Sequence, residues 1–252
     1  LKYMKKDFKV SVIMSVYNGE DYLSNSIDSI LEQSYQNYEF IIINDASNDS
    51  TLEKLKHKAA IDSRIKIINN QTNRGLTKSL IKAINNSSGD IIVRQDVDEI
   101  SFYNRIETLL TYFKNENISA VGSNSLDIYS KNLSFEWGYH SEDKILNIIR
   151  YKTIFPHGSS AFRKSDYMKI GGYDDKFITC QDFDLWNKLI KVGRIVMTEE
   201  ILLKRYILKN SISGKRKFRQ FYDSLRIRLK YKTKLIEFKI IYISIIYIII
   251  SL

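Results

Sequence analysis

Four runs of consecutive apolar residues, rich in isoleucine and valine, alternate with helix-like segments in the first hundred residues. The runs span residues 9–17, 38–44, 65–69 and 90–95. A strand that is apolar at every position is covered on both faces, whereas a strand with one face in water alternates apolar and polar residues. The segments between the runs repeat apolar residues at helical spacing. This order predicts an α/β fold with a mostly parallel sheet and flanking helices.

Polar residues stand where each of these strands would end. Tyr17 follows the first run, Asp45 the second, Arg74 comes soon after the third, and Asp96 and Asp98 follow the fourth. In an open parallel sheet, ligands bind outside the carboxyl ends of the strands, because the loops diverge there. We therefore expect a binding site at this edge of the sheet.

The sequence RQDVDE at residues 94–99 sets three carboxylates within four residues. Crowded carboxylates repel one another unless a cation or hydrogen-bond donors compensate. Asp96 and Asp98 form an Asp-x-Asp (DXD) pattern that suits a divalent cation, with substrate phosphates and water as further ligands. A solvated acidic loop is the alternative, because the pattern is common.

Taken together, these motifs resemble the inverting family 2 glycosyltransferases, which use nucleotide sugars and have the GT-A fold. The resemblance runs through residues 9–100 and resumes at 171–189. It implies a GT-A domain with a Rossmann-like sheet over residues 1–213, in which 9–100 form the nucleotide-binding half and the remainder, from 101, the acceptor half. A basic amphipathic and hydrophobic helical tail would follow at 214–252. The implied donor is a UDP- or dTDP-sugar, and the implied acceptor is a glycan or lipid-linked glycan.

The resemblance also implies roles for single residues. Ser15 and Tyr17 would line the nucleotide pocket, and Asp45 would accept a hydrogen bond from the base. Asp96 would lie near the ribose. Asp98 would hold Mg²⁺ or Mn²⁺ on the donor diphosphate, in keeping with the preference of these cations for carboxylate and phosphate oxygens.

The catalytic base implied by the resemblance is Asp182, where the family usually has Glu-Asp and this chain has Gln181-Asp182. A carboxylate within hydrogen-bond reach of the acceptor hydroxyl can take its proton. Asp184 is the competing candidate, and Asp182 has the alternative role of capping a helix. The family's late Arg-x-His, which completes the metal shell, is replaced here by Tyr206 and Leu208. A third metal ligand is therefore missing or comes from elsewhere, and tight metal binding without donor is not expected.

Four further residues lie close to these motifs. Arg74 pairs with the donor diphosphate or remains in solvent, and His157 contacts the acceptor or makes a structural hydrogen bond. Cys180 has no histidine partner in the sequence and is expected to be unreactive. Trp186 is expected to pack in the core.

The net charge of +10 is concentrated in one segment. Residues 202–239 carry thirteen Lys or Arg against two acids, and the remainder is close to neutral. Residues 214–234 are expected to form a basic helix with an apolar stripe, and residues 240–252 carry no charge. Such a pattern is typical of attachment to an anionic membrane, not to nucleic acid. As a helix, the last segment would reach about 20 Å, short of the roughly 30 Å hydrocarbon core.

The chain has a single cysteine, so it has no internal disulfide framework, as expected in a reducing compartment. No Cys or His pair has zinc-ligand spacing. With the basic tail, this predicts a cytoplasmic protein at the inner face of the cell membrane.

The sequence thus predicts a metal-dependent inverting glycosyltransferase of bacterial surface-polysaccharide synthesis. A nucleotidyltransferase is one alternative, but it would normally show a glycine-rich basic loop, and SVYNGED at 15–21 has one glycine and two acids. A non-catalytic module that binds membrane or nucleic acid through the basic tail is the other.

Overall fold

The computed structural model describes residues 7–129, 134–207 and 217–231. Its strands are β1 (Val10–Val16), β2 (Tyr38–Asn44), β3 (Ile65–Asn69), β4 (Ile91–Arg94), β5 (Glu99–Ser101), β6 (Ile118–Ile128), β7 (Ser134–Glu136), β8 (Ala161–Arg163) and β9 (Arg194–Tyr206). Its helices are α1 (Leu23–Leu31), α2 (Thr51–Ile61), α3 (Leu76–Asn85), α4 (Arg105–Tyr112), α5 (Glu142–Ile148), α6 (Lys164–Lys169), α7 (Gln181–Leu189) and α9 (Lys217–Lys230), with a 3₁₀ turn η1 (His157–Ser159).

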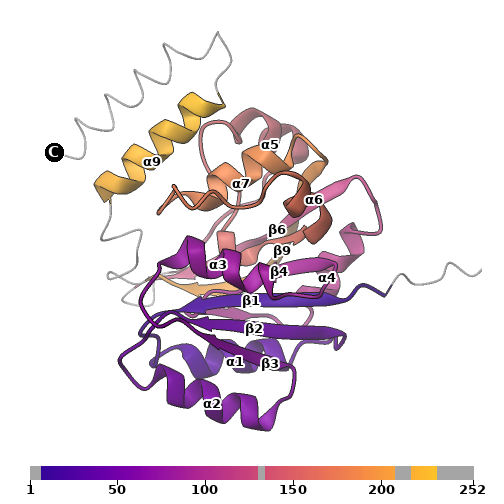
Figure 1. The fold of residues 1–252 in the computed structure, drawn as a ribbon. Helices are drawn as coiled ribbons and strands as arrows, with labels where there is room; N and C mark the ends of the chain where they lie inside the picture. The colour runs from indigo at the N-terminus through magenta and orange to yellow at the C-terminus, as the bar shows by residue number, and fades with distance from the viewer. Residues whose placement is uncertain (1–6, 130–133, 208–216, 232–252) are drawn as a thin grey trace, which may run out of the picture.

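One sheet runs through the molecule in the order β3-β2-β1-β4-β8-β6-β9-β5, with β7 paired to β6 (Figure 1). The pairs β3–β2, β2–β1 and β1–β4 are parallel. The predicted strands at 38–44 and 65–69 match β2 and β3, and those at 9–17 and 90–95 each extend slightly beyond β1 and β4. The predicted α/β fold is confirmed, and the sheet is parallel from β3 to β4 as expected. The sheet as a whole is mixed, because β8, β7 and β5 pair antiparallel with their neighbours.

The central strands are buried on both faces, as their continuous apolar runs predicted. In β1, Val12 and Met14 join the hydrophobic cluster of α1, α2 and α4, while Ile13 joins the cluster of α3, α5 and α7 on the other face. Figure 1 shows α1 and α2 below the sheet and α3 above it. Trp186 of α7 is fully buried against Phe155, so its predicted place in the core is correct.

The second half of the chain continues the same sheet. Strand β8 is antiparallel to both β4 and β6 and so joins the two halves. Strand β9 pairs in parallel with β6 along most of its length, with register shifts at three places. The short β5 adds to the far edge of β9 and places Glu99 opposite Arg205. Strand β9 was not predicted from the sequence.

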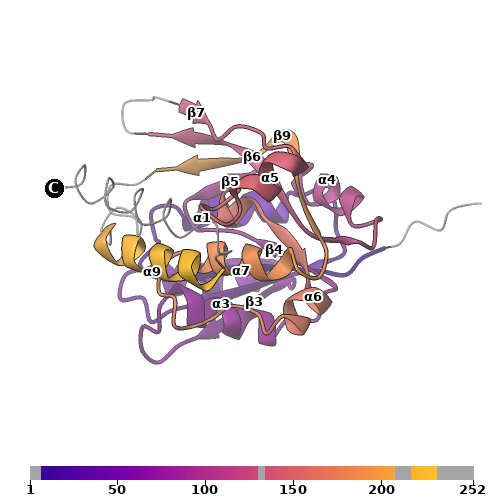
Figure 2. The same cartoon turned by 90° about the horizontal axis from the view of Figure 1, so that it is seen from above.

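The predicted basic helix is present as α9, which packs against α7 (Figures 1 and 2). Ile227 of α9 is fully buried with Phe177 and Phe183. None of the helices in the described ranges is both long and apolar enough to cross a bilayer. The apolar segment at 240–252 lies outside the described residues.

Gly122 in β6 gives a test of this packing. A Cβ atom at position 122 would lie 2.2 Å from Cγ of Phe155. Gly122→Ala should therefore lower the free energy of unfolding by about 1–3 kcal/mol, measured by urea denaturation, because the ring must move. In the double variant Gly122→Ala/Phe155→Leu the loss should be smaller than the sum of the two single losses. Strict additivity would show that the ring is not the obstacle.

Candidate active site

The carboxyl ends of β1, β2 and β4 lie together at one edge of the sheet, to the left in Figure 1. Successive connections run in opposite directions from β1, since β2 lies on one side of it and β4 on the other, and such a switch point opens a crevice. Tyr17, Asp45 and the acidic turn at 96–99 all follow these strands. The structure therefore brings the predicted strand-end residues to one edge.

A buried guanidinium compensates part of the acidic turn. Arg94, the last residue of β4, is fully buried and forms an ion pair with Asp96. Burial opposes ionisation of Asp96, but the charge of Arg94 outweighs it, and the pKa of Asp96 is lowered. Arg94 also donates to the carbonyl oxygens of Ile13 and Gln95, both at 3.2 Å. The same side chain thus neutralises the turn and ties it to β1.

The other two carboxyls of the turn resist ionisation. Burial and the charges of Asp96 and Asp98 raise the pKa of Glu99 to about 8. Glu99 accepts a hydrogen bond from the backbone N–H of Asp96 at 3.0 Å. Burial and the charge of Asp96 raise the pKa of Asp98 to about 6. The turn therefore favours an additional positive charge.

Asp98 is the carboxyl best placed to hold a cation. Among the described residues, its carboxylate has no hydrogen bond or ion pair with another side chain, whereas Asp96 is paired and Glu99 is buried. The described ranges contain no group of three or more His, Cys, Asp or Glu that could hold a metal. One carboxylate plus donor phosphates and water is an arrangement that Mg²⁺ accepts. The Asp98 carboxylate therefore fits a divalent cation that would also be bound by donor phosphates.

Asp45 shapes the wall at the end of β2. It is buried, and its carboxylate accepts hydrogen bonds from the backbone N–H groups of Arg74 and Gly75 at 2.9 and 2.8 Å. Asn70 Nδ2 donates to it at 2.7 Å. Gly75 has φ 82°, which favours glycine at the start of α3. The Arg74 side chain itself is exposed.

Tyr17 and Ser15 lie on the β1 side of the edge. Tyr17 is 50 % exposed, and Ser15 is half-buried within the strand. The following loop contains Asn18 at φ 51°, and Ala46 in the neighbouring loop has φ 62°. The backbone N–H of Asn18 donates to Ser47 Oγ at 3.0 Å and joins the two loops. Positive φ at residues other than glycine is costly and is often found where a ligand binds.

Asp182 lies in the first turn of α7 and is half-buried. Its Oδ2 accepts a hydrogen bond from Thr153 Oγ1 at 2.7 Å. Helix α7 starts from Cys180, at φ 57°, without any side-chain cap, so Asp182 does not have the capping role considered above. Burial and the charge of Asp182 raise the pKa of the Cys180 thiol to about 12, which keeps it protonated and unreactive, as expected.

The structure distinguishes the two candidate bases. Asp184 is fully buried and forms ion pairs with Lys188 at 2.9 Å and Lys230 at 2.8 Å. It also accepts a hydrogen bond from Tyr231 Oη at 2.8 Å. Lys230 at the end of α9 and Tyr231 just after it thus join α9 to α7, which gives Asp184 a structural role. Asp182, with one hydroxyl partner, is the more available carboxylate.

His157 connects the two walls of the site. Its Nε2 lies 2.7 Å from Tyr173 Oη, which is the structural hydrogen bond considered above. Burial and the neighbouring Arg94 lower the pKa of His157 to about 4, while Asp182 and Asp96 act in the opposite sense. The ring of His157 also lies 6.1 Å from that of Trp186, centroid to centroid, which puts η1 against α7.

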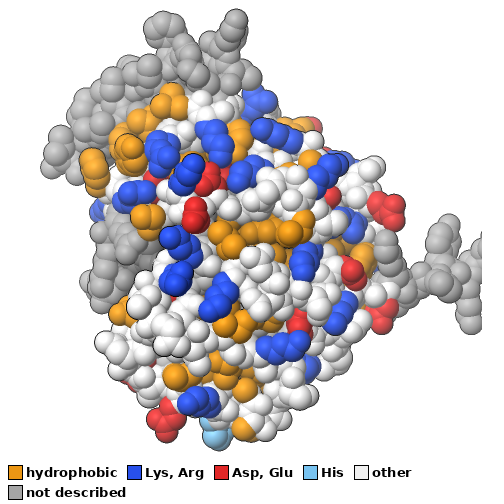
Figure 3. Space-filling model, in the orientation of Figure 1, with side chains coloured by type: hydrophobic (Ala, Val, Ile, Leu, Met, Phe, Trp, Pro, Cys, Tyr) orange, Lys and Arg blue, Asp and Glu red, His pale blue; other side chains and the backbone are white. Residues whose placement is uncertain are grey.

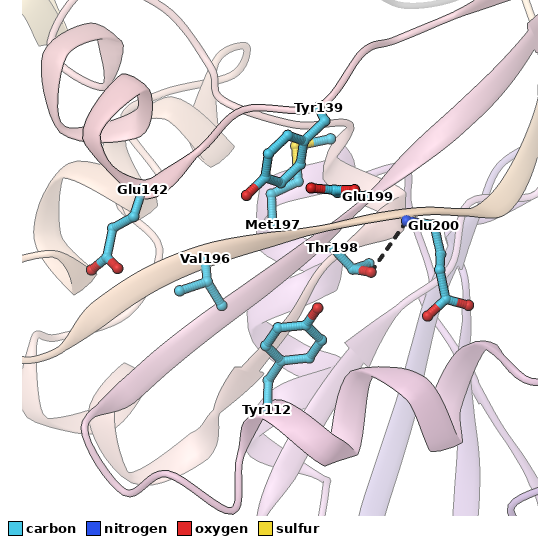
Figure 4. A pocket seen from close by; sticks show the side chains of 8 residues that line it. All are labelled: Tyr112, Tyr139, Glu142, Val196, Met197, Thr198, Glu199 and Glu200. Carbon is cyan, nitrogen blue, oxygen red and sulfur yellow. Dashed lines mark hydrogen bonds between the residues drawn. The ribbon is translucent and has the colours of Figure 1, made fainter.

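A surface pocket of about 430 Å³ lies over β9, between Tyr112 of α4 and Tyr139 before α5 (Figure 4). It is also lined by Glu142 and residues 196–200. None of the residues predicted for the site lines this pocket. The strand-end edge, which carries the carboxyls of raised pKa, is therefore the candidate site.

Three supporting residues were not predicted from the sequence. Arg94 and Thr153 are described above, and Arg105 is a second fully buried guanidinium. Arg105 donates to the carbonyl oxygens of Arg94 and Gly158, at 2.6 and 2.5 Å. An arginine inside an apolar strand was a visible signal for Arg94, whereas Thr153 carried none.

Comparison with known proteins places these features in a family. The family described as Glycosyl transferase family 2 matches residues 11–171. The protein named glycosyltransferase EpsE from Bacillus subtilis (strain 168) is 38 % identical over 195 residues, which cover 73 % of this chain and 68 % of EpsE. The O-antigen biosynthesis glycosyltransferase WbnJ from Escherichia coli is 33 % identical over 184 residues, covering 72 % of this chain and 71 % of WbnJ.

Solved structures support the fold. The mannosyltransferase PcManGT from Pyrobaculum calidifontis, in complex with GDP-Man and Mn²⁺, aligns with a TM-score of 0.71 at 18 % identity and covers 91 % of this chain. TarS 1–349 from S. aureus, in complex with UDP, aligns with a TM-score of 0.68 at 16 % identity over 87 % of this chain. The chain spans 66 % and 64 % of these two structures.

The lowered pKa of His157 predicts a loss of stability in acid. The unfolded chain binds a proton on His157 near pH 6.5, whereas the folded chain resists it until about pH 4. The free energy of unfolding should fall as pH drops through this window, by up to about 1.4 kcal/mol per pH unit from this residue. In His157→Gln, urea denaturation from pH 7 to 4 should show a shallower fall than in wild type. His57→Gln, at an exposed position of α2, should keep the wild-type slope.

Asp184 should matter for stability and not for turnover. Asp184→Asn leaves Lys188 and Lys230 without their buried carboxylate, which should lower the free energy of unfolding by about 3 kcal/mol in chemical denaturation. The variant's turnover per folded molecule should remain close to that of wild type. A large loss of turnover without a loss of stability would make Asp184 the better candidate for the base.

Proposed function

The chain belongs to glycosyltransferase family 2, and we propose that it transfers one sugar, with inversion, from a nucleotide-diphosphate sugar to a hydroxyl of a glycan or lipid-linked glycan. The observation that carries this proposal is the pair of available carboxyls, Asp98 after β4 and Asp182 at the start of α7. Within the described residues, Asp98 has no side-chain partner and Asp182 has one, Thr153.

Asp182 acts as the general base. Its carboxylate takes the proton of the acceptor hydroxyl while that oxygen forms a bond to the anomeric carbon of the donor sugar. The bond between this carbon and the diphosphate oxygen breaks, and its electron pair leaves with the nucleoside diphosphate. Thr153 orients Asp182 by donating a hydrogen bond to Oδ2.

Asp98 is the residue that would hold a divalent cation on the donor diphosphate. A bound Mg²⁺ or Mn²⁺ would act as a Lewis acid toward the charge on the leaving diphosphate. The raised pKa of Asp98, about 6, reflects a burial cost that a cation offsets. Ser15, Tyr17, Asp45, Arg74 and Asp96 complete the donor side of the proposed site.

The relatives support a biological setting. WbnJ is named for O-antigen biosynthesis, and we place this chain in bacterial surface-polysaccharide synthesis on that similarity. The related folds hold GDP-Man, UDP and UDP-GlcNAc. UDP- and dTDP-sugars are the proposed donors, so the test must include GDP-sugars as competitors.

Two substitutions should separate the proposed roles. With a donor found from a panel of UDP-, dTDP- and GDP-sugars, Asp182→Asn should lower kcat by about 10²–10⁴-fold. Its donor affinity, measured by calorimetry with Mn²⁺, should remain unchanged. Asp98→Asn should weaken donor binding in the presence of Mn²⁺, and the difference from wild type should disappear in EDTA.

Asp143→Asn, at an exposed position of α5, is the matched control and should change neither quantity. If no nucleotide sugar binds with or without metal, the proposed function is wrong and a non-catalytic role is favoured. Incorporation of a nucleotidyl group in place of a sugar would instead indicate a nucleotidyltransferase.

A further inference from the structure

Helix α9 turns a polar face toward the protein body. Asp223, at the centre of that face, is fully buried. Its Oδ2 accepts hydrogen bonds from the backbone N–H and Oγ1 of Thr179, at 3.2 and 3.0 Å, and pairs with Arg219 at 2.9 Å. Ile227 is the buried apolar contact of this face. The helix is therefore fixed to the loop before α7 largely by a buried charge.

The apolar stripe of α9 faces away from the body. Phe218, Tyr222 and Leu229 are 84 %, 47 % and 41 % exposed. With Leu225, they recur at intervals of four, three and four residues, which places them on one side of the helix. A helix of a globular protein normally turns such a stripe toward the core. The predicted stripe also included Phe221, which is half-buried; Phe218, Tyr222 and Leu229 are its exposed members.

Basic side chains flank the exposed stripe. Helix α9 carries five Lys or Arg and one acid, the buried Asp223, which pairs with Arg219 and Arg226. Lys230 pairs with Asp184, and Arg228 donates to the carbonyl oxygen of Tyr151. Arg219 and Arg226 both lie over the ring of Tyr222, at 5.8 and 5.5 Å from its centroid. Lys217 is exposed at the start of the helix. Figure 3 shows this surface at its upper left, as hydrophobic side chains with Lys and Arg beside them.

We propose that the outer face of α9 docks on an anionic lipid bilayer. Apolar side chains bordered by Lys and Arg match the boundary between acyl chains and negatively charged headgroups, and long basic side chains can reach headgroups from beside an apolar stripe. The charge of the face is complementary to an anionic surface. The uncharged residues 240–252 follow α9 in the sequence and have the composition for contact with the same membrane.

Vesicle flotation tests this surface without any donor or acceptor, so its result is independent of turnover. The outer-face variant is Phe218→Ser/Tyr222→Ser/Leu229→Ser. The matched control is Ile61→Ser/Leu146→Ser/Met168→Ser, at apolar positions that are 70 %, 51 % and 58 % exposed on other helices. Each is compared in the full chain and in a full chain that also carries Ile245→Asp/Ile249→Asp, so that the C-terminal apolar residues cannot mask the effect.

The full chains should bind phosphatidylcholine vesicles that contain phosphatidylglycerol, and should bind phosphatidylcholine alone more weakly. The outer-face substitutions should lower the partition coefficient at least about ten-fold, whereas the control substitutions should not. Binding should also weaken as salt rises. Equal binding by the outer-face variant and its parent, in the Ile245→Asp/Ile249→Asp background, overturns the proposal. A second result also overturns the proposal. If the parent chain binds no vesicles but self-associates, and the outer-face substitutions abolish that self-association, the face joins two copies of the chain.

Discussion

The ion pair between the fully buried Arg94 and the half-buried Asp96 is the interaction on which the candidate site depends. Carboxylates cannot enter a strand end that is covered on both faces unless positive charge is buried with them. Arg94 and Arg105 supply that charge and also bind carbonyl oxygens of β1, β4 and η1. The same two guanidinium groups therefore offset the charge of the carboxylates and hold the turn in place. The carboxylate that remains, Asp98, is left for a ligand.

The sequence predicted best those strands in which consecutive residues are all buried. Strands β1, β2 and β4 are covered on both faces, so each appears as a continuous apolar run, and their ends could be located to within a residue or two. Strand β9 could not be found in this way. It contains Glu199 and Glu200 and is stabilised by pairing with β6, including an ion pair from Arg205 to Asp127, 78 residues earlier in the chain. Such long-range pairing leaves no local pattern.

The same limit applies to the site. Asp45, Asp96 and Asp98 were predicted because they follow strands directly. The resemblance favoured Asp182 as the base, but the residues alone could not remove Asp184 as a competitor, because Lys230, which pairs with Asp184, lies 46 residues away on another helix. The partner of Asp182, Thr153, lies 29 residues before it, in a segment with no recognisable motif. Contacts between distant segments decided which carboxylate remained available.

The bonds from Asp223 to Thr179 have a geometric consequence. They connect the helix with the outward apolar face to the loop that leads into Asp182, the proposed base. On a molecule docked through that face, the height of the base above the headgroups would be fixed by the protein. Only an acceptor whose reactive hydroxyl stands at that height could be used, and a lipid-linked chain would be selected by its length as well as by its sugar.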